Sequence, residues 1–464
     1  MERVPPSSLS WQNKIIMAFY SDIDTDIKEI NSTCYPNGIT SKYYTLDIPN
    51  LSLISSIQID KDDFFYLRFP KKFTEILATG KLKSFLLNDY DELNNFKLLF
   101  DFAPIDSTIE KLPDYFSYIS FPFNSSPGVP YSCWVIPEVV IKSDGAKCLI
   151  RINSADEKFN FNSKIEEIAS MLGTQPSSET RSLFTGVSVT SIEDESLDEF
   201  SEKVVKMKAQ ITSGVLNKGV VSRQRMIRFE GKFDIPNAIN TLSEKYPECT
   251  ILLTNYSNKL FLAATPETLF QLEGCNLLTE AVAGSIQSSD ESGEQLTREN
   301  ELLHSVKNLE EHFIVRDFLV NNLKLIAPVV SFDHKPATRK LKNVTHLVSK
   351  ISARLPGNTS PIELIKLLFP TPALCGYPKL DAANIINEIE GKPRDLYGGV
   401  FGYITTGGLS EYFVSIRCGF LLDDHAILYA GGGIVANSDP YEEFTETEIK
   451  FTPLNSLFTD EIQY

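Results

Sequence analysis

Acidic side chains recur at helical spacing close to the C-terminus of the chain. Glu443, Glu446 and Lys450 are three and seven residues apart, which would place them on one face of a helix. Two carboxylates in this arrangement repel each other unless a positive charge lies between them. A hard cation such as Mg²⁺ favours carboxylate and water oxygens and would supply that charge. A solvated acidic face is the commoner meaning of the same spacing, so other features have to separate the two interpretations.

Two other glutamates stand at positions that suit metal binding or proton transfer. Glu311 belongs to the acidic stretch Glu310-Glu311-His312 within a long helical pattern. One glutamate from each of two helices would be enough for Mg²⁺, which commonly takes one or two protein carboxylates. Glu267 follows an apolar run, and a carboxyl desolvated at the end of a strand acquires a raised pKa that suits a general acid. A solvent-exposed turn glutamate is the simpler alternative for Glu267.

Three basic side chains stand at the ends of, or inside, apolar segments. Lys218 begins a probable strand, and it would need burial or a cationic neighbour to act as a base near neutral pH; a solvated lysine is the simpler alternative. Arg417 lies in a buried-strand pattern, where a bidentate grip on a carboxylate and a structural ion pair explain it equally well. His346 is also flanked by apolar residues, and a hydrogen-bonded core histidine is its simpler interpretation.

The hydrophobic pattern predicts the elements that must position these side chains. Residues 1–170 alternate short runs of Phe, Tyr, Ile and Leu with Pro, Gly, Asn and Asp, which is typical of strands joined by turns. Further along, strands and helices are mixed without strict alternation, which favours an α+β fold over a parallel βαβ sheet. The expected elements are helices over residues 200–214 and 295–325, strands over 218–229, 413–420 and 426–430, glycines at 431–433 that interrupt the last strand, and a helix that begins at Ser438-Asp439-Pro440.

Composition divides the 464 residues into three parts. Residues 173–199 are rich in Ser, Thr, Glu and Asp, and we expect a linker or surface loop there. They separate an N-terminal part, residues 1–172, from a C-terminal region, residues 200–464, which contains every candidate residue named above. The C-terminal region is therefore expected to hold the functional site.

Charge and cysteine usage narrow the class of partner and the compartment. The net charge is −17 and the isoelectric point is near 4.9, which argues against nucleic acid or an anionic membrane surface as a partner. An anionic substrate would have to be captured by local cations. Seven scattered cysteines without a CxxC pair indicate reduced thiols, and neither a secretory signal nor a run of about 18 apolar residues is visible. We therefore expect a cytoplasmic protein without membrane spans.

The order of these segments along the chain is more specific than any one of them. The series resembles the chorismate-utilising family, which includes isochorismate, salicylate, anthranilate and aminodeoxychorismate synthases. The resemblance covers roughly residues 200–457, whereas residues 1–170 match only loosely. The segments that carry it are, in order, residues 217–223, Ala264-Thr265-Pro266-Glu267, residues 280–285 and 307–312, Thr345-His346-Leu347-Val348-Ser349, Phe369-Pro370-Thr371-Pro372-Ala373 with residues 376–379, residues 394–402, Ile416-Arg417, and residues 430–450.

The resemblance implies an isochorismate synthase, an isomerase that adds water at C2 of chorismate and removes the C4 hydroxyl. Lys218 falls where water-adding members carry lysine and ammonia-using members carry glutamine. The family pattern makes Lys218 the general base that activates water and Glu267 the general acid that protonates the departing hydroxyl. Salicylate synthase, which goes on to eliminate pyruvate, is the first alternative, because Phe369 stands where isochorismate synthases carry histidine. Anthranilate or aminodeoxychorismate synthase, or an inactive relative, are the remaining alternatives.

The resemblance also implies a magnesium site and a substrate pocket. Glu311 and Glu446 would hold Mg²⁺, with Glu443 acting nearby or through water, and the metal would grip the ring carboxylate of chorismate. Departures from the family pattern, at Gly219, Asn308, Phe369, Asp395 and Gly432, remove no proposed acid, base or metal ligand. The residues expected to bind the substrate are Ala283, Gly284, Ser285, His346, Thr371, Tyr397, Arg417, Gly431, Gly432, Gly433 and Lys450.

The implied architecture is an α+β fold of two packed antiparallel β-sheets with helices on the outside and the site between the sheet edges. The N-terminal part is expected to complete this core. No glutaminase partner is expected, and the chain would act as a monomer or weak homodimer. Isochorismate feeds menaquinone, siderophore and salicylate routes, and the sequence does not choose among them.

Overall fold

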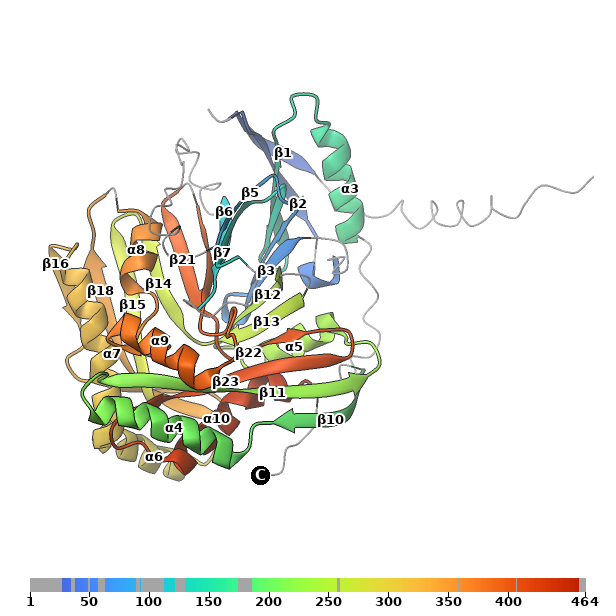
Figure 1. Ribbon diagram of the computed structural model, residues 1–464. Helices are drawn as coiled ribbons and strands as arrows, with labels where there is room; N and C mark the ends of the chain where they lie inside the picture. The colour runs from blue at the N-terminus through green and yellow to red at the C-terminus, as the bar shows by residue number, and fades with distance from the viewer. Residues whose placement is uncertain are drawn as a thin grey trace, which may run out of the picture.

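The computed structural model describes residues 27–34, 38–48, 51–56, 63–88, 92, 112–121, 130–173, 186–256, 259–357, 359–405 and 407–458. Within these residues, two antiparallel sheets are surrounded by helices (Figure 1). The predicted α+β architecture with two antiparallel sheets is therefore confirmed. No helix of this described part is both long and apolar enough to cross a bilayer.

The larger sheet has thirteen strands among the described residues. Strands from the first 154 residues and strands from the second half of the chain share it, and they meet where β3 pairs with β12. Across the sheet the order is β1 (Lys28–Cys34), β2 (Thr40–Asp47), β9 (Lys147–Ser154), β8 (Val139–Ser143), β4 (Thr74–Thr79), β3 (Phe64–Phe69), β12 (Thr250–Tyr256), β13 (Lys259–Thr265), β22 (Cys418–Leu421), β23 (His425–Ile434), β11 (Lys218–Glu230) and β10 (Ser188–Asp194), and β19 (Gly376–Tyr377) also pairs with β11.

The smaller sheet has ten strands in the same part of the chain, and here β6 of the N-terminal part pairs with β20. Both sheets therefore mix N-terminal and C-terminal strands, so the two halves share one core. The order across this sheet is β16 (Val329–Phe332), β18 (Val344–Arg354), β15 (Asn276–Gln287), β14 (Thr268–Glu273), β21 (Leu409–Val414), β20 (Val400–Ile404), β6 (Tyr115–Ile119), β7 (Ser132–Ile136) and β5 (Lys83–Leu87), and β17 (Ala337–Lys340) also pairs with β18.

Local sequence explains where the helices begin. Ser196 and Glu199 form a capping box at the start of α4, and Asp439 caps α10, which has Pro440 in its first turn. The helices are α3 (Phe161–Gly173), α4 (Leu197–Thr212), α5 (Ile235–Lys245), α6 (Ser292–His304), α7 (Val306–Lys324), α8 (Pro361–Leu368), α9 (Lys379–Glu390) and α10 (Pro440–Asn455), with short 3₁₀ helices η1 (Leu53–Ser56) and η2 (Pro70–Lys72).

Aromatic side chains fill a core cluster to which both sheets contribute. Phe116, Phe401 and Phe413 come from the smaller sheet, and Phe261 and Phe420 come from the larger one. Helix α5 belongs to a second cluster on the larger sheet, whereas α7 and α8 belong to a third on the smaller sheet. Each large aromatic side chain removed from water stabilises the fold by about 2–3 kcal/mol, so this shared cluster fixes how the sheets meet.

The chain passes between the two sheets at two neighbouring points. β13 of the larger sheet leads through Pro266 and Glu267 into β14 of the smaller one, and β21 leads back through residues 415–417 into β22. The Val414 amide donates to the Glu267 carbonyl at 3.1 Å, and the Ala264 amide donates to the Arg417 carbonyl at 3.0 Å. These bonds hold the two crossings side by side, so Glu267 and Arg417 lie together between the sheets.

The crossing at residues 415–417 corrects the prediction of one strand over residues 413–420. Arg417 has a φ of 50°, in the left-handed region that a non-glycine residue rarely adopts, and a ladder cannot continue through it. The prediction from this apolar run was correct about the burial of the segment and wrong about a single continuous strand. The glycines at 431–433, in contrast, do not interrupt β23, which pairs with β11 through all three of them.

Two other predicted elements also differ from the structure. The helix expected over residues 295–325 is two helices, because the Ser305 hydroxyl accepts from the Asn308 amide and caps α7. The expected loop 173–199 contains β10, and Leu197 already begins α4. β10 pairs with β11 through main-chain bonds while most of its side chains stay exposed, so its polar composition concealed a strand.

Candidate active site

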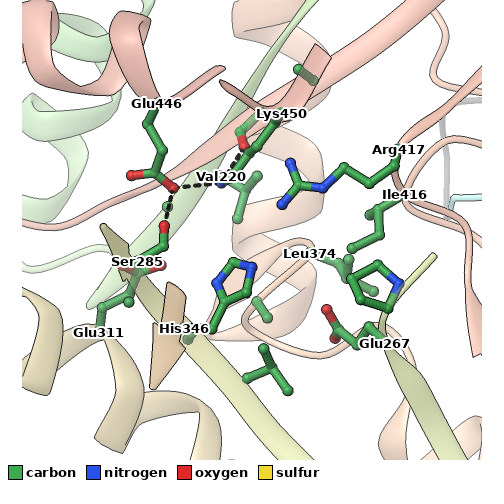
Figure 2. A pocket seen from close by; sticks show the side chains of 18 of the residues that line it. Val220, Glu267, Ser285, Glu311, His346, Leu374, Ile416, Arg417, Glu446 and Lys450 are labelled. Carbon is green, nitrogen blue, oxygen red and sulfur yellow. Dashed lines mark hydrogen bonds and ion pairs between the residues drawn. The ribbon is translucent and has the colours of Figure 1, made fainter. Parts of the chain in front are cut away.

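A cavity lies between the sheets, beside the two chain crossings (Figure 2). Most of the predicted site residues contribute to its wall, although they come from distant parts of the chain. Those that line it are Glu267, Ala283, Gly284, Ser285, Glu311, His346, Tyr397, Arg417, Gly431, Gly433, Glu446 and Lys450. Four predicted residues, Lys218, Thr371, Gly432 and Glu443, do not line it.

Lys218 lies directly behind the cavity wall. Its side chain is fully buried at the start of β11, and its ammonium donates to Glu311 Oε1 at 2.8 Å. Glu311 comes from α7 and lines the cavity, so the pair connects a buried cation to the open space. Thr371, in contrast, does not line the cavity, and its carbonyl accepts hydrogen bonds from the amides of Leu374 and Cys375 at 3.0 Å. We conclude that Thr371 shapes the turn before the lining residue Leu374 and does not face the cavity.

Strand β23 presents its glycines to two sides, because successive positions of a strand point to opposite faces. Gly431 and Gly433 face the cavity, and Gly432 faces α10. A Cβ at Gly433 would overlap the carboxylate of Glu311 and the stem of Lys218. A Cβ at Gly432 would instead lie 2.9 Å from Oε2 of Glu443. The glycines at 431 and 433 are thus needed for space. Gly432 does not line the cavity, and a contact between its main chain and the substrate stays a prediction.

Each of the three glutamates predicted to surround a metal is paired with a lysine. Besides the Glu311–Lys218 pair, Lys450 lies 2.6 Å from Glu446, and Ser285 donates its hydroxyl to the same carboxylate at 2.8 Å. Burial alone would raise the pKa of Glu446, but the charges of Lys450 and Lys307 outweigh it and hold the pKa below its ordinary value. Glu446 is therefore ionised and faces the cavity.

Glu443 lies deeper than the other two carboxylates. Its side chain is fully buried, one turn along α10 from the cavity wall, and Oε1 lies 2.5 Å from the ammonium of Lys307. Burial, followed by the negative charge of Glu446, raises the pKa of Glu443. Lys307 was not predicted as a site residue, although its position four residues before Glu311 on one helical face was the available signal.

This donor set fits a hard divalent cation. Glu311 and Glu446 come from two helices and line one cavity, and the Ser285 hydroxyl, which donates to Glu446, adds a third oxygen there. Within the described residues, no three His, Cys, Asp or Glu side chains converge as a complete metal-binding group. Mg²⁺ commonly takes only one or two protein carboxylates and completes its octahedron with water and substrate oxygens. Two glutamates therefore satisfy the protein's share.

Glu267 is a carboxyl poised to hold a proton. Burial raises its pKa to about 7, although the charges of Lys218, Arg417 and Lys450 act in the opposite direction. It lies on the cavity wall at the first chain crossing, and Figure 2 shows its carboxyl turned toward the open space. A carboxyl with a pKa near neutrality is suited to general acid catalysis.

Arg417 brings a positive charge without an ion-pair partner within the described residues to the same space. Among the described residues, its guanidinium has neither an ion pair nor a hydrogen bond, and Figure 2 shows it pointing into the cavity from the second crossing. Burial lowers the pKa of Arg417, which is the cost of holding this charge away from water. Burial, followed by the positive charges of Arg417 and Lys450, lowers the pKa of His346 to about 3, so this histidine is neutral. A buried, unpaired arginine indicates an anionic ligand.

Apolar and aromatic side chains close the rest of the cavity, and among them only Tyr397 was predicted as a site residue. Val220, Val282, Leu374 and Ile416 line it, and Tyr397 stacks on Tyr429 with ring centroids 5.2 Å apart. Their apolar types are typical of any core, so no sequence signal separates them from ordinary packing residues. Their effect is to exclude water beside the charged groups, which strengthens every electrostatic interaction there.

The cavity of this two-sheet α+β fold is lined by a carboxyl with a pKa near 7 and by an arginine without an ion pair, and a buried lysine lies behind its wall, which is a set of groups suited to acid–base chemistry. The comparison with protein families identifies the family to which the chain belongs. The chain belongs to the family of chorismate binding enzymes, whose sequence model matches residues 35–459.

Individual relatives agree with this membership. The isochorismate synthase MenF of Bacillus subtilis is 31% identical over 273 residues, which cover 59% of this chain and 58% of that protein. Anthranilate synthase component 1 of Haloferax volcanii is 30% identical over 261 residues, which cover 55% and 49%. The matches thus span about half the length of these relatives. The solved structure of MenF, the menaquinone-specific isochorismate synthase from Escherichia coli, has a TM-score of 0.73, covers 98% of this chain and 100% of its own, and is 21% identical, which shows the shared fold.

Proposed function

We propose that this protein is a Mg²⁺-dependent isochorismate synthase, which isomerises chorismate by adding water at C2 and removing the C4 hydroxyl. The observation that carries the proposal is the placement of buried Lys218 behind one wall of a cavity that also presents the Glu267 carboxyl, with its raised pKa. A base and an acid are thus available to one bound ring. The MenF relatives named above support the same reaction.

Chorismate is a dianion, and the cavity supplies cations for both of its carboxylates. Arg417 and Lys450 would bind the enolpyruvyl carboxylate, beside Tyr397. Glu311 and Glu446 would hold Mg²⁺, which would neutralise and orient the ring carboxylate. His346, being neutral, and the loop of Ala283, Gly284 and Ser285 would contact the ring. These local charges offset the repulsion expected from a chain with a net charge of −17.

Proton transfer then follows from the two flanking groups. The side-chain nitrogen of Lys218 would accept a proton from the water whose oxygen bonds to C2. The ring double bonds shift, the C4–oxygen bond breaks, and Glu267 gives its proton to the departing hydroxyl, which leaves as water. Orientation and positioned acid–base groups together account for several orders of magnitude in rate. Because water is the nucleophile, no glutaminase partner is needed, and a cytoplasmic location is part of the same proposal.

Metal removal gives the direct test of this function. Purified protein incubated with chorismate and Mg²⁺ is expected to form isochorismate, identified by chromatography and mass, and an excess of EDTA should abolish the product. Salicylate and pyruvate would instead assign the salicylate synthase activity, and an aminated product that requires ammonium would assign the anthranilate-type activity. Absence of turnover with Mg²⁺, both with and without ammonium, would contradict a catalytic role.

Gly433→Ala is expected to lower kcat/KM about 100-fold, because a new methyl group displaces the Glu311 carboxylate and the Lys218 stem by about 1 Å. Gly432→Ala is the matched control on the next residue of β23, where the methyl group meets the end of the Glu443 side chain. We expect the control to stay within about tenfold of the wild type. Steady-state kinetics and melting temperatures of both variants check this, and equal losses would show that the cavity-facing side of β23 has no special role.

A further inference from the structure

Two arginines of β11 reach across to α10, the helix that carries Glu443, Glu446 and Lys450. Arg223 donates from Nε to the Thr447 hydroxyl at 2.8 Å, and Arg223 and Arg225 both donate to Glu448. The Arg223 guanidinium also lies 4.0 Å from the ring centroid of Phe444. Both arginines are buried, so these contacts are shielded from water.

The opposite side of the same arginines is held by β10. Asp194 accepts from Arg223 at 2.7 Å and from Nε of Arg225 at 2.8 Å. The ring of Phe451 lies 4.9 Å from the Arg223 guanidinium and 4.5 Å from that of Arg225. Two buried arginines are thus enclosed by two carboxylates and aromatic faces. This arrangement fixes planar guanidinium groups far better than a single exposed ion pair would.

The residues that contact the arginines and the residues that serve the cavity lie on adjacent faces of α10. At 100° per residue, positions 444, 447, 448 and 451 form one stripe, and positions 443, 446 and 450 form the neighbouring stripe. A rotation of α10 by about 20° would move its side-chain tips, about 5–6 Å from the axis, by about 2 Å. Metal coordination tolerates deviations of about 0.2 Å, so such a rotation would disrupt the site.

We infer that Arg223 and Arg225 are positioning residues, a clamp that sets the rotation of α10 and thereby holds Glu446 and Lys450 at the cavity wall. The clamp ties the strand that begins at Lys218 to α10, the helix that carries Glu446, which is one of the two proposed metal ligands. It therefore fixes the base and the metal site relative to each other. The part of the inference that concerns metal affinity rests on the proposed function, whereas the part that concerns the orientation of α10 does not.

Arg223→Lys and Glu448→Gln test the clamp in the full chain. The first keeps the charge but loses the Nε bond to Thr447 and the planar stacking, and the second keeps the shape but loses the shared carboxylate. Arg228→Gln is the matched control, because Arg228 lies on the same strand in an exposed pair with Glu193. Amide hydrogen exchange of α10, followed by mass spectrometry, and calorimetric titration with MgCl₂ are measured for all of them.

We expect faster exchange confined to α10, with β12 and β13 unchanged, and an affinity for Mg²⁺ lowered about 10- to 100-fold in both clamp variants but not in the control. Turnover of chorismate should recover as the Mg²⁺ concentration rises. Exchange of α10 equal to that of the control, or a loosened helix with wild-type metal affinity, overturns the positioning role. If the wild type itself binds no Mg²⁺, the proposed metal site fails, and confined exchange alone still decides whether the clamp orients α10.

Discussion

Lys218→Met is expected to lower kcat by about 10²- to 10⁴-fold while KM changes by no more than a few fold, since a positioned general base contributes about that much. Methionine preserves the length of the side chain and its burial but has no atom that accepts the proton of water. The groups that would bind the substrate carboxylates, Arg417, Lys450, Glu311 and Glu446, are untouched. The loss should therefore fall on the chemical step.

The metal site gives an independent check on the same variant. Lys218 pairs with Glu311, so its removal frees that carboxylate. We expect Lys218→Met to bind Mg²⁺ at least as tightly as the wild type in a calorimetric titration. Lys206→Met, which removes an exposed lysine from α4, is the matched control and should keep wild-type kinetics. Turnover of Lys218→Met within tenfold of the wild type would mean that another group acts as the base.

The parts of the fold that the sequence predicted well are those with a strong local signal. The cap at Asp439 and Pro440 located the start of α10, and the order of motifs across the second half implied the two-sheet architecture. Elements that depend on tertiary pairing were harder to predict. β10 has exposed, polar side chains and exists because its main chain completes the edge of a sheet beside β11, which no local pattern records.

The site shows the same division at the level of single residues. Glu267 and Arg417 were identified as candidates, but their proximity depends on two chain crossings, and the hydrophobic pattern predicted a continuous strand through the one that contains Arg417. The glycines of β23 were taken for a break and are instead positions where Glu311 and Tyr397 occupy the space of a side chain. Lys307 was overlooked because a cluster of acidic residues is easy to recognise in a sequence, whereas the lysine that neutralises it is only one of many lysines there.

Glu267→Gln is expected to lower kcat/KM by about 10²- to 10⁴-fold at neutral pH and to change the shape of the pH profile. The raised pKa of Glu267, about 7, means that the wild-type carboxyl is protonated below this pH and ionised above it. A general acid acts from its protonated form, so wild-type kcat/KM should fall about tenfold per pH unit above pH 7 through this group. Glutamine cannot donate the proton, and this alkaline fall should disappear from the residual activity.

The melting temperature of Glu267→Gln distinguishes the loss of a general acid from damage to the fold. Between about pH 4.5 and pH 7 the folded carboxyl of Glu267 keeps its proton while the unfolded one ionises, so the wild type loses stability as the pH rises through that window. The neutral amide removes this loss, and Glu267→Gln should melt no lower than the wild type at pH 8. Glu273→Gln, at the exposed end of β14, is the control for both measurements. An alkaline fall that persists in Glu267→Gln would assign the donated proton to a different group.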